Sequence, residues 1–199
     1  QNPKRYPGFV EHYYRTEETD WTPNLEEIER QILGLFQNPV FLKLTRAAPR
    51  ILEVEELRQI QVDDIPVWVS LDALVRDGKG GFVIVDWKTG KNHTTEKVAG
   101  QLGIYALYVL DRYVHDTGSE RPKIQAMYVN TRHNSYETMT IDHDAIDAAK
   151  HVVRSSAEQM RSYLQDISEN LADKDDFPKI PEGSTSCAMC AYRRSCDRE

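Results

Sequence analysis

The chain has 199 residues, a length that predicts one domain with a sizeable core and a small appendage. Its formal net charge is −7 at pH 7. The charge argues against a protein coated in basic surface, although a nucleic-acid substrate needs only a local basic strip. The longest apolar runs are too short to cross a bilayer and no secretory signal pattern is present, which predicts an intracellular, cytoplasmic protein without a membrane partner. Because the first residue is glutamine rather than methionine, we expect the sequence to be a piece of a longer chain.

Hydrophobic spacing and turn residues divide the chain into helices and strands. In chain order, we expect a helix over 25–44, strands over 51–60, 67–75 and 81–88, a helix over 95–114, strands over 123–130 and 136–141, and a helix over 142–167. This order predicts an α/β fold in which a central mixed sheet is flanked by helices.

We expect three segments along the chain. An N-terminal helical segment over 1–45 would continue from upstream sequence, and the core would span 46–167. Residues 168–186 are polar, acidic and proline-bearing, which is typical of a linker. The linker and a compact cysteine-bearing tail would together form the last segment, 168–199.

Two aspartates and a lysine lie on neighbouring predicted strands, at Asp72, Asp86 and Lys88. Side chains alternate between the two faces of a strand, so Asp86 and Lys88 share one face. On the preceding strand, Trp68 and Leu74 should share a face with Asp72. Pairing of the two strands through a turn-rich loop would bring the charged groups together. A divalent-metal phosphodiesterase site needs such groups: hard oxygen ligands for Mg²⁺ or Mn²⁺ and a cation beside the attacked phosphate.

The alternative interpretation of these side chains is a solvated surface, because charged residues at strand ends are usually exposed. The apolar run Phe82-Val-Ile-Val85 directly precedes Asp86. A surface pair is less expected at the end of so apolar a strand, and this context favours a site.

The order of elements, with Asp…Asp-x-Lys on the second and third strands, resembles the PD-(D/E)XK nuclease superfamily and more closely its RecB-like branch. That branch includes the CRISPR-associated RecB-like exonucleases and the AddB-type repair nucleases. The resemblance rests on three motifs: Leu71-Asp72-Ala73, Val85-Asp86-Trp87-Lys88-Thr89-Gly90-Lys91 and Gln101-Leu-Gly-Ile-Tyr105. It covers residues 44–199 and implies a restriction-endonuclease-like core.

The resemblance implies a role for each residue of the predicted site. Asp72 and Asp86 would bind Mg²⁺ or Mn²⁺, with the backbone carbonyl of Trp87 as a third oxygen ligand. Lys88 would orient the attacking water or stabilise charge that develops on the phosphorane. We favour this electrostatic role because a lysine acting as general base needs a pKa far below its usual value of about 10.4.

Gln101 and Tyr105 are four residues apart and are therefore neighbours on one helical face. The resemblance places such a pair near the active site, where it contacts DNA or the surroundings of the catalytic lysine. Simple core packing is the alternative for Tyr105. Gln101 is more informative, because a glutamine within an apolar stripe needs hydrogen-bond partners for its amide.

All three cysteines lie at the end of the chain, as Cys187, Cys190 and Cys196. Thiols this close together point to soft-metal ligation more than to disulfides. Their spacing resembles the terminal cysteines of iron–sulfur RecB-like nucleases, which implies a 4Fe–4S cluster whose fourth cysteine lies upstream of this chain. A zinc site completed by a histidine, an incomplete site and unligated thiols are the alternatives.

RecB-like nucleases also carry a histidine on a helix ahead of the strands, where it reaches the metal. His12 is the only histidine before Asp72 and is the candidate here, and a histidine upstream of this chain is the alternative. Glu53, Glu55 and Glu56 also precede Asp72. One of them could add a carboxylate to the site, but solvent exposure on an edge strand is their expected role.

We expect a metal-dependent deoxyribonuclease, exo- or endonucleolytic, that acts on single-stranded DNA or duplex ends. DNA repair, recombination, CRISPR or phage DNA processing would be its setting, with helicase or other nuclease-complex subunits as partners. One rival is a catalytically inactive nucleic-acid-binding or scaffolding module of the same fold. Another is a zinc-ribbon adaptor with an α/β body, and fold resemblance alone does not decide among them.

Overall fold

The computed structural model describes residues 22–46, 50–90, 95–114, 122–181, 184–188 and 190. Its helices and strands follow in the order α2 (Thr22–Leu35), α3 (Pro39–Arg46), β1 (Ile51–Glu53), β2 (Leu57–Val62), β3 (Ile65–Ser70), β4 (Ala73–Arg76), β5 (Phe82–Lys88), α4 (Thr95–Tyr113), β6 (Ile124–Asn130), β7 (Ser135–Ile141), α5 (His143–Arg161), the 3₁₀ turn η2 (Lys174–Asp176) and α6 (Thr185–Ala188). The chain divides into two compact units, residues 26–159 and residues 1–25 with 160–199. Within the described ranges, no helix is both long and apolar enough to cross a membrane.

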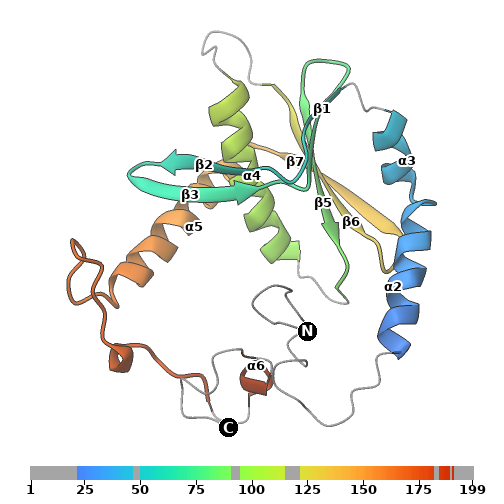
Figure 1. The fold of residues 1–199 in the computed structure, drawn as a ribbon. Coiled ribbons are helices and arrows are strands. Elements are labelled where there is room, and N and C mark those ends of the chain that lie inside the picture. The colour runs from blue at the N-terminus through green and yellow to red at the C-terminus, as the bar shows by residue number, and fades with distance from the viewer. Residues whose placement is uncertain are drawn as a thin grey trace. The chain divides into compact units, whose positions relative to one another are not determined.

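Five strands form one sheet in the order β1-β4-β5-β6-β7 (Figure 1). The central pair, β5 and β6, is parallel, and the other three pairs are antiparallel. A parallel pair needs a crossover connection, and the chain between β5 and β6 supplies one as α4. The predicted α/β class with a mixed sheet is therefore confirmed.

Helices cover both faces of this sheet. On one face, Phe82 and Ile84 of β5 enter the larger core together with side chains of α4 and α5. On the other face, Val85 of β5 and Val129 of β6 pack against Val40 of α3. Alternate residues of β5 thus enter opposite cores, as the period of two in the sequence predicts.

The strands β2 and β3 form a separate two-stranded sheet that lies across α4 (Figure 1). Its inward-facing side chains, among them Ile60 and Val69, join the larger core. Its outward face presents the directly paired Gln59 and Trp68, and Trp68 is 62% exposed. The hairpin therefore buries one face only, as an antiparallel pair packed on a helix does, and its outward face leaves Leu57 and Trp68 exposed.

The structure corrects two of the predicted strands. The predicted strand 51–60 is interrupted between β1 and β2, where Glu55 adopts a φ of 48°. The predicted strand 67–75 is interrupted between β3 and β4, at Leu71 and Asp72. The two breaks lie together, because the backbone N–H of Glu55 donates to the carbonyl of Leu71 at 2.9 Å.

The break at Asp72 also shifts the alternation of side chains. Val69 and Leu71 point into the core before the break, and Leu74 does so after it. Trp68 is exposed whereas Leu74 is fully buried, so the expectation that Trp68, Asp72 and Leu74 share one face is wrong. The bend lets each strand bury its own apolar residues without a continuous register.

The predicted helix 25–44 consists of two helices, α2 and α3. Pro39 is the first residue of α3, a position that suits proline although proline interrupts a helix interior. Asn38 caps α3, because its side-chain oxygen accepts the backbone N–H of Val40 at 2.9 Å. Asn38 is fully buried and also donates to the side chain of Asn134 at 2.8 Å.

The predicted helix 142–167 is shorter than expected. It begins at the cap Asp142, whose side chain accepts the N–H of Ala145 at 2.9 Å, and α5 ends at Arg161. After it, Gln165 and Asp166 turn back and donate to the carbonyl of Leu171. This local turn takes the hydrogen bonds that a longer helix would have used.

The unit of residues 1–25 and 160–199 is described in part. The rings of Tyr163 and Phe177 stack with their centroids 5.3 Å apart. Asp173 caps η2 by accepting the N–H of Asp175 at 3.0 Å. Capped turns and a ring stack order this stretch, which the sequence predicts to be a linker.

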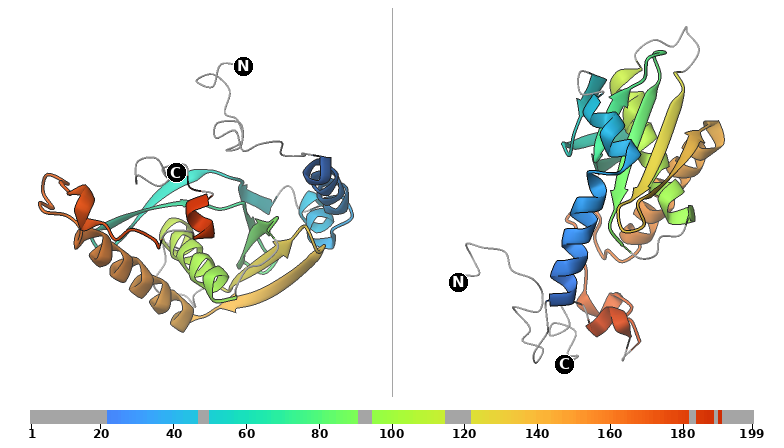
Figure 2. Two further views of the ribbon diagram at one scale, coloured as in Figure 1. Left: turned by 90° about the horizontal axis from the view of Figure 1, so that it is seen from below. Right: turned by 90° about the vertical axis from the view of Figure 1, so that its right-hand side faces the viewer.

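The helices α4 and α5 lie next to each other (Figure 2). Gly103 of α4 faces Ala145 and Ala149 of α5. A Cβ atom at this position would lie 2.9 Å from the Cβ of Ala149 and 3.1 Å from the carbonyl oxygen of Ala145. Neither atom belongs to a flexible side chain. The glycine therefore sets how closely the two helices approach.

We predict that Gly103→Ala destabilises the fold relative to Gly100→Ala. Both substitutions lie in α4 and gain the same helix propensity, about 1 kcal/mol. A Cβ at Gly100 meets nothing within 4 Å, whereas a Cβ at Gly103 forces the helices apart, at a cost of about 1–3 kcal/mol. The measurement is denaturant unfolding of both variants. Equal free energies of unfolding would show that the crossing is not tight.

Candidate active site

Asp86 and Lys88 lie at the end of β5, on the face covered by α4. The strand carries Phe82, Ile84, Asp86 and Lys88 on this face, and the first two are core residues. Asp86 is only 1% exposed. Burying an ionised carboxylate costs free energy unless the group is paired and hydrogen-bonded. The partners of Asp86 therefore determine the chemistry of this end of β5.

Lys88 is the charged partner of Asp86. Its ammonium Nζ lies 2.9 Å from Oδ1 and 2.7 Å from Oδ2 of Asp86. It also donates to the side-chain oxygen of Gln101 at 3.0 Å. Lys88 thus connects β5 to α4.

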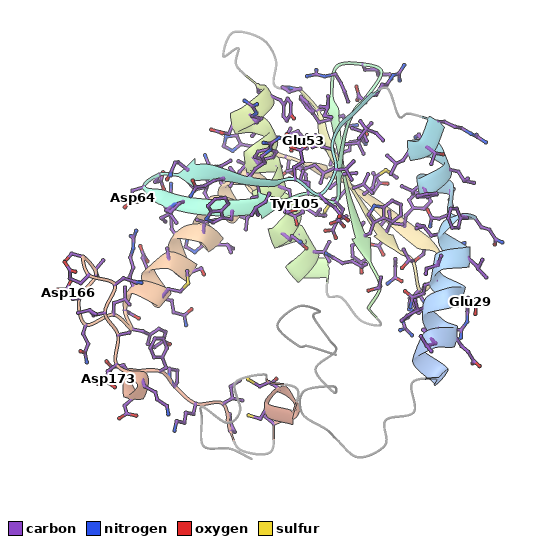
Figure 3. The ribbon with its side chains drawn as sticks, in the orientation of Figure 1. Glu29, Glu53, Asp64, Tyr105, Asp166 and Asp173 are labelled. Carbon is purple, nitrogen blue, oxygen red and sulfur yellow. The ribbon has the colours of Figure 1, made fainter. Side chains whose placement is uncertain are left out.

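Gln101 is in turn fixed by Tyr105, one turn further along α4 (Figure 3 marks Tyr105). The amide nitrogen of Gln101 donates to the hydroxyl of Tyr105 at 2.8 Å. This bond leaves the amide oxygen of Gln101 directed at Lys88. The side chains of Asp86, Lys88, Gln101 and Tyr105 therefore form one continuous hydrogen-bonded chain.

Tyr105 belongs both to the core and to this chain. It is 9% exposed and packs in the larger core, so the alternative of core packing is correct for its ring. Burial raises the pKa of the phenol, and the carboxylates of Asp86 and Asp72 add to this effect, whereas Gln101 and Lys88 oppose it. The hydroxyl of Tyr105 therefore stays protonated at neutral pH, and the negative charges of both carboxylates favour this protonated form.

Asp72 lies in the bend between β3 and β4 and reaches β5 from there. Its Oδ2 accepts the backbone N–H of Trp87 at 2.6 Å. The ladder between β4 and β5 ends at the pair Ala73 and Val85, so Trp87 lies beyond it. The N–H and C=O of one strand residue point to the same side, and the carbonyl of Trp87 therefore also faces Asp72.

These groups fit a hard divalent cation. Asp72, Asp86 and the carbonyl of Trp87 offer oxygen ligands, and Mg²⁺ is commonly bound through one or two carboxylates together with waters and phosphate. Among the described residues, no group of three or more His, Cys, Asp or Glu side chains is arranged to hold a metal. The described part of the site thus offers two carboxylates and one backbone carbonyl, and a bound cation would need further ligands from elsewhere.

Glu53, which precedes Asp72 on an edge strand, is not solvated as expected. It is 5% exposed, and the hydroxyls of Tyr108 and Tyr113 donate to it. Glu55 and Glu56 are exposed, in agreement with the prediction. The sequence contains no local signal for the burial of Glu53, because both tyrosines lie more than fifty residues away.

The turn between β6 and β7 supports the end of β5. Thr131 donates its backbone N–H and its hydroxyl to the carbonyl of Lys88, at 2.9 and 3.2 Å. Arg132 donates to the carbonyl of Thr89 at 3.3 Å and forms an ion pair of 2.9 Å with Glu27 of α2. Sequence reasoning missed these residues, and only the parallel pairing of β5 and β6 could have indicated them.

The remaining predicted ligands lie wholly or partly outside the described residues. His12 and Cys196 are among the residues that the structure does not describe. Cys187 and Cys190 are half-buried, and the N–H of Cys190 donates to the carbonyl of Cys187 at 3.2 Å. The turn brings the backbones of these two cysteines together, and the cysteine cluster stays a prediction.

No curated protein matches the sequence of this chain. Among solved structures, the "Crystal structure of SSO0001" is 19% identical in sequence, with a TM-score of 0.37. The match covers 67% of this chain and 61% of the length of that protein. The family model described as "PD-(D/E)XK nuclease superfamily" matches residues 8–197, a span that includes the whole Asp72, Asp86 and Lys88 arrangement. The mixed sheet with helices on both faces is the restriction-endonuclease-like fold, and the chain belongs to the PD-(D/E)XK nuclease superfamily.

Proposed function

We propose that this chain is a deoxyribonuclease that depends on Mg²⁺ or Mn²⁺. Members of its superfamily are in general nucleases that hydrolyse phosphodiester bonds and use divalent metals. The observation that carries the proposal is the position of Lys88, with its ammonium between the carboxylate of Asp86 and the amide of Gln101. Asp72 meets the same strand one residue away, at Trp87.

Asp72, Asp86 and the carbonyl of Trp87 are the proposed metal ligands. When bound, the cation would lower the pKa of a coordinated water and neutralise charge on the scissile phosphate. Asp72 is held at β5 by the backbone N–H of Trp87, and Asp86 by the ammonium of Lys88. His12 stays a candidate for a further ligand.

Lys88 is the proposed electrostatic group. A half-buried ammonium held by Asp86 and Gln101 is already directed before the substrate arrives, so little reorganisation is needed as charge develops on the phosphorane. Tyr105 fixes the amide of Gln101, and Gln101 fixes the ammonium. The pair Gln101 and Tyr105 also supports placement in the RecB-like branch.

The proposed substrate is DNA, as single strands or duplex ends, in repair, recombination, CRISPR or phage DNA processing. Helicase or other nuclease-complex subunits are the proposed partners. A catalytically inactive nucleic-acid-binding module of the same fold is the second candidate. The scarcity of acidic or histidine ligands among the described site residues favours it, because a degenerate site would lack them.

We predict that Asp86→Asn and Lys88→Ala each lower the rate of DNA cleavage by at least about 100-fold, because each removes charge from the reacting centre. The assay follows labelled single- and double-stranded DNA with Mg²⁺ or Mn²⁺. The control is Asp63→Asn, which removes an exposed ion pair with Arg154 and should leave cleavage unchanged. Parental rates in both site variants would rule out the proposed mechanism.

A second prediction separates an active metal site from a degenerate one. Lys88→Ala should bind Mn²⁺ several-fold more tightly than the parent, because an ammonium within 3 Å of Asp86 opposes a cation there. Asp72→Ala should bind Mn²⁺ more weakly, and Lys79→Ala, in the exposed β4–β5 loop, is the charge-matched control. Isothermal calorimetry measures all three. The inactive module is supported if Asp72→Ala binds Mn²⁺ as well as the parent does.

The cysteine tail carries a third prediction. We propose that Cys187, Cys190 and Cys196 bind a 4Fe–4S cluster, with zinc as the alternative. Protein purified without oxygen should contain about four irons per chain when the fourth ligand is present, and Cys187→Ser should reduce this content. Elemental analysis for iron and zinc measures it. Stoichiometric zinc without iron would contradict the cluster.

A further inference from the structure

Glu53 is a buried carboxylate for which the proposed chemistry has no use. Its Oε1 accepts the hydroxyls of Tyr108 and Tyr113, each at 2.5 Å, and lies 3.9 Å from the Nε of Arg58. Its Oε2 is buried and has no hydrogen-bond partner among the described residues. Glu53 is thus fixed on one oxygen only.

This arrangement is poorly explained as a source of stability. Replacing a buried charged group by well-packed apolar residues is often neutral or stabilising, because desolvation of the charge is avoided. Burial and the carboxylate of Glu53 raise the pKa of Tyr113 to about 12, and the pKa of Tyr108 is raised further for the same reasons. Both phenols therefore stay protonated and donate to Glu53.

The cluster connects the two elements that carry the site. Tyr108 and Tyr113 lie on α4, which also carries Gln101 and Tyr105. Glu53 ends β1 and pairs with Leu74 on β4, the strand that begins directly after Asp72. Figure 3 shows Glu53 close to α4, on which Tyr105 also lies.

We propose that Glu53, Tyr108 and Tyr113 are positioning residues of the nuclease site. They fix α4 against β1 and β4, so that Gln101 meets Lys88 while Asp72 meets Trp87. Two hydroxyls on one carboxylate oxygen define both the height and the rotation of the helix, which apolar contacts alone leave less defined. The proposal rests on the nuclease function proposed above.

The test compares three variants that differ in polarity more than in shape. Tyr108→Phe/Tyr113→Phe loses only two hydroxyls, and adding Glu53→Met makes the cluster fully apolar. We expect the triple variant to unfold at the same or a higher temperature than the parent, with kcat reduced about tenfold and KM for DNA unchanged. Glu53→Gln keeps an acceptor for both hydroxyls and should retain kcat within about twofold. If the triple variant does not fold, the double variant alone decides, with the same expected loss of kcat.

A readout independent of cleavage is the side-chain amide signal of Gln101 in a ¹H–¹⁵N spectrum, assigned with Gln101→Glu. It should move in the double and triple variants and stay in place in Tyr163→Phe, which loses a hydroxyl in the other unit. If the parent does not cleave DNA, the proposed nuclease function is wrong, and the Gln101 signal alone tests the positioning role. If the parent cleaves DNA, a triple variant with the parental kcat would overturn the proposal. Whether or not the parent cleaves DNA, a Gln101 signal that stays in place in the double and triple variants would also overturn it.

Discussion

A carboxylate in an apolar strand is the constraint on which the rest of the site depends. Asp86 is 1% exposed at the end of a run of core residues, and an ionised carboxylate is stable there only beside a cation. Lys88 supplies that cation from the same face of the same strand. The ammonium also donates to Gln101, and this bond links the ion pair to the position of α4 along β5.

The two faces of β5 accordingly carry different kinds of side chain. The α4 face carries the hydrogen-bonded charged groups Asp86 and Lys88, whereas Val85 and Trp87 on the other face pack under α3. The end of β5 is also fixed by the neighbouring turn, because Thr131 donates both its backbone N–H and its hydroxyl to the carbonyl of Lys88. The end of β5 is thus restrained both through its backbone, by Thr131, and through its side chains, by Gln101.

Local periodicity was sufficient to predict much of this site. Alternation along 82–88 placed Asp86 and Lys88 together, and a spacing of four placed Gln101 beside Tyr105. The breaks at Glu55 and at Asp72 could not be predicted in this way, because each depends on a hydrogen bond to the other segment. The burial of Glu53 could not be predicted from its neighbours either. A glutamate on an edge strand is expected to be exposed, and the helix α4 that covers Glu53 lies far away in the sequence.

The two breaks have a consequence for how such a fold can vary. Because Glu55 bonds to Leu71, the chain enters and leaves the β2–β3 hairpin at adjacent points, and the register of β1 with β4 does not depend on the length of what lies between. The hairpin is therefore a separate insertion in the chain between β1 and β4. The exposed end of the hairpin can therefore change in length or sequence while β4 keeps its position in the sheet.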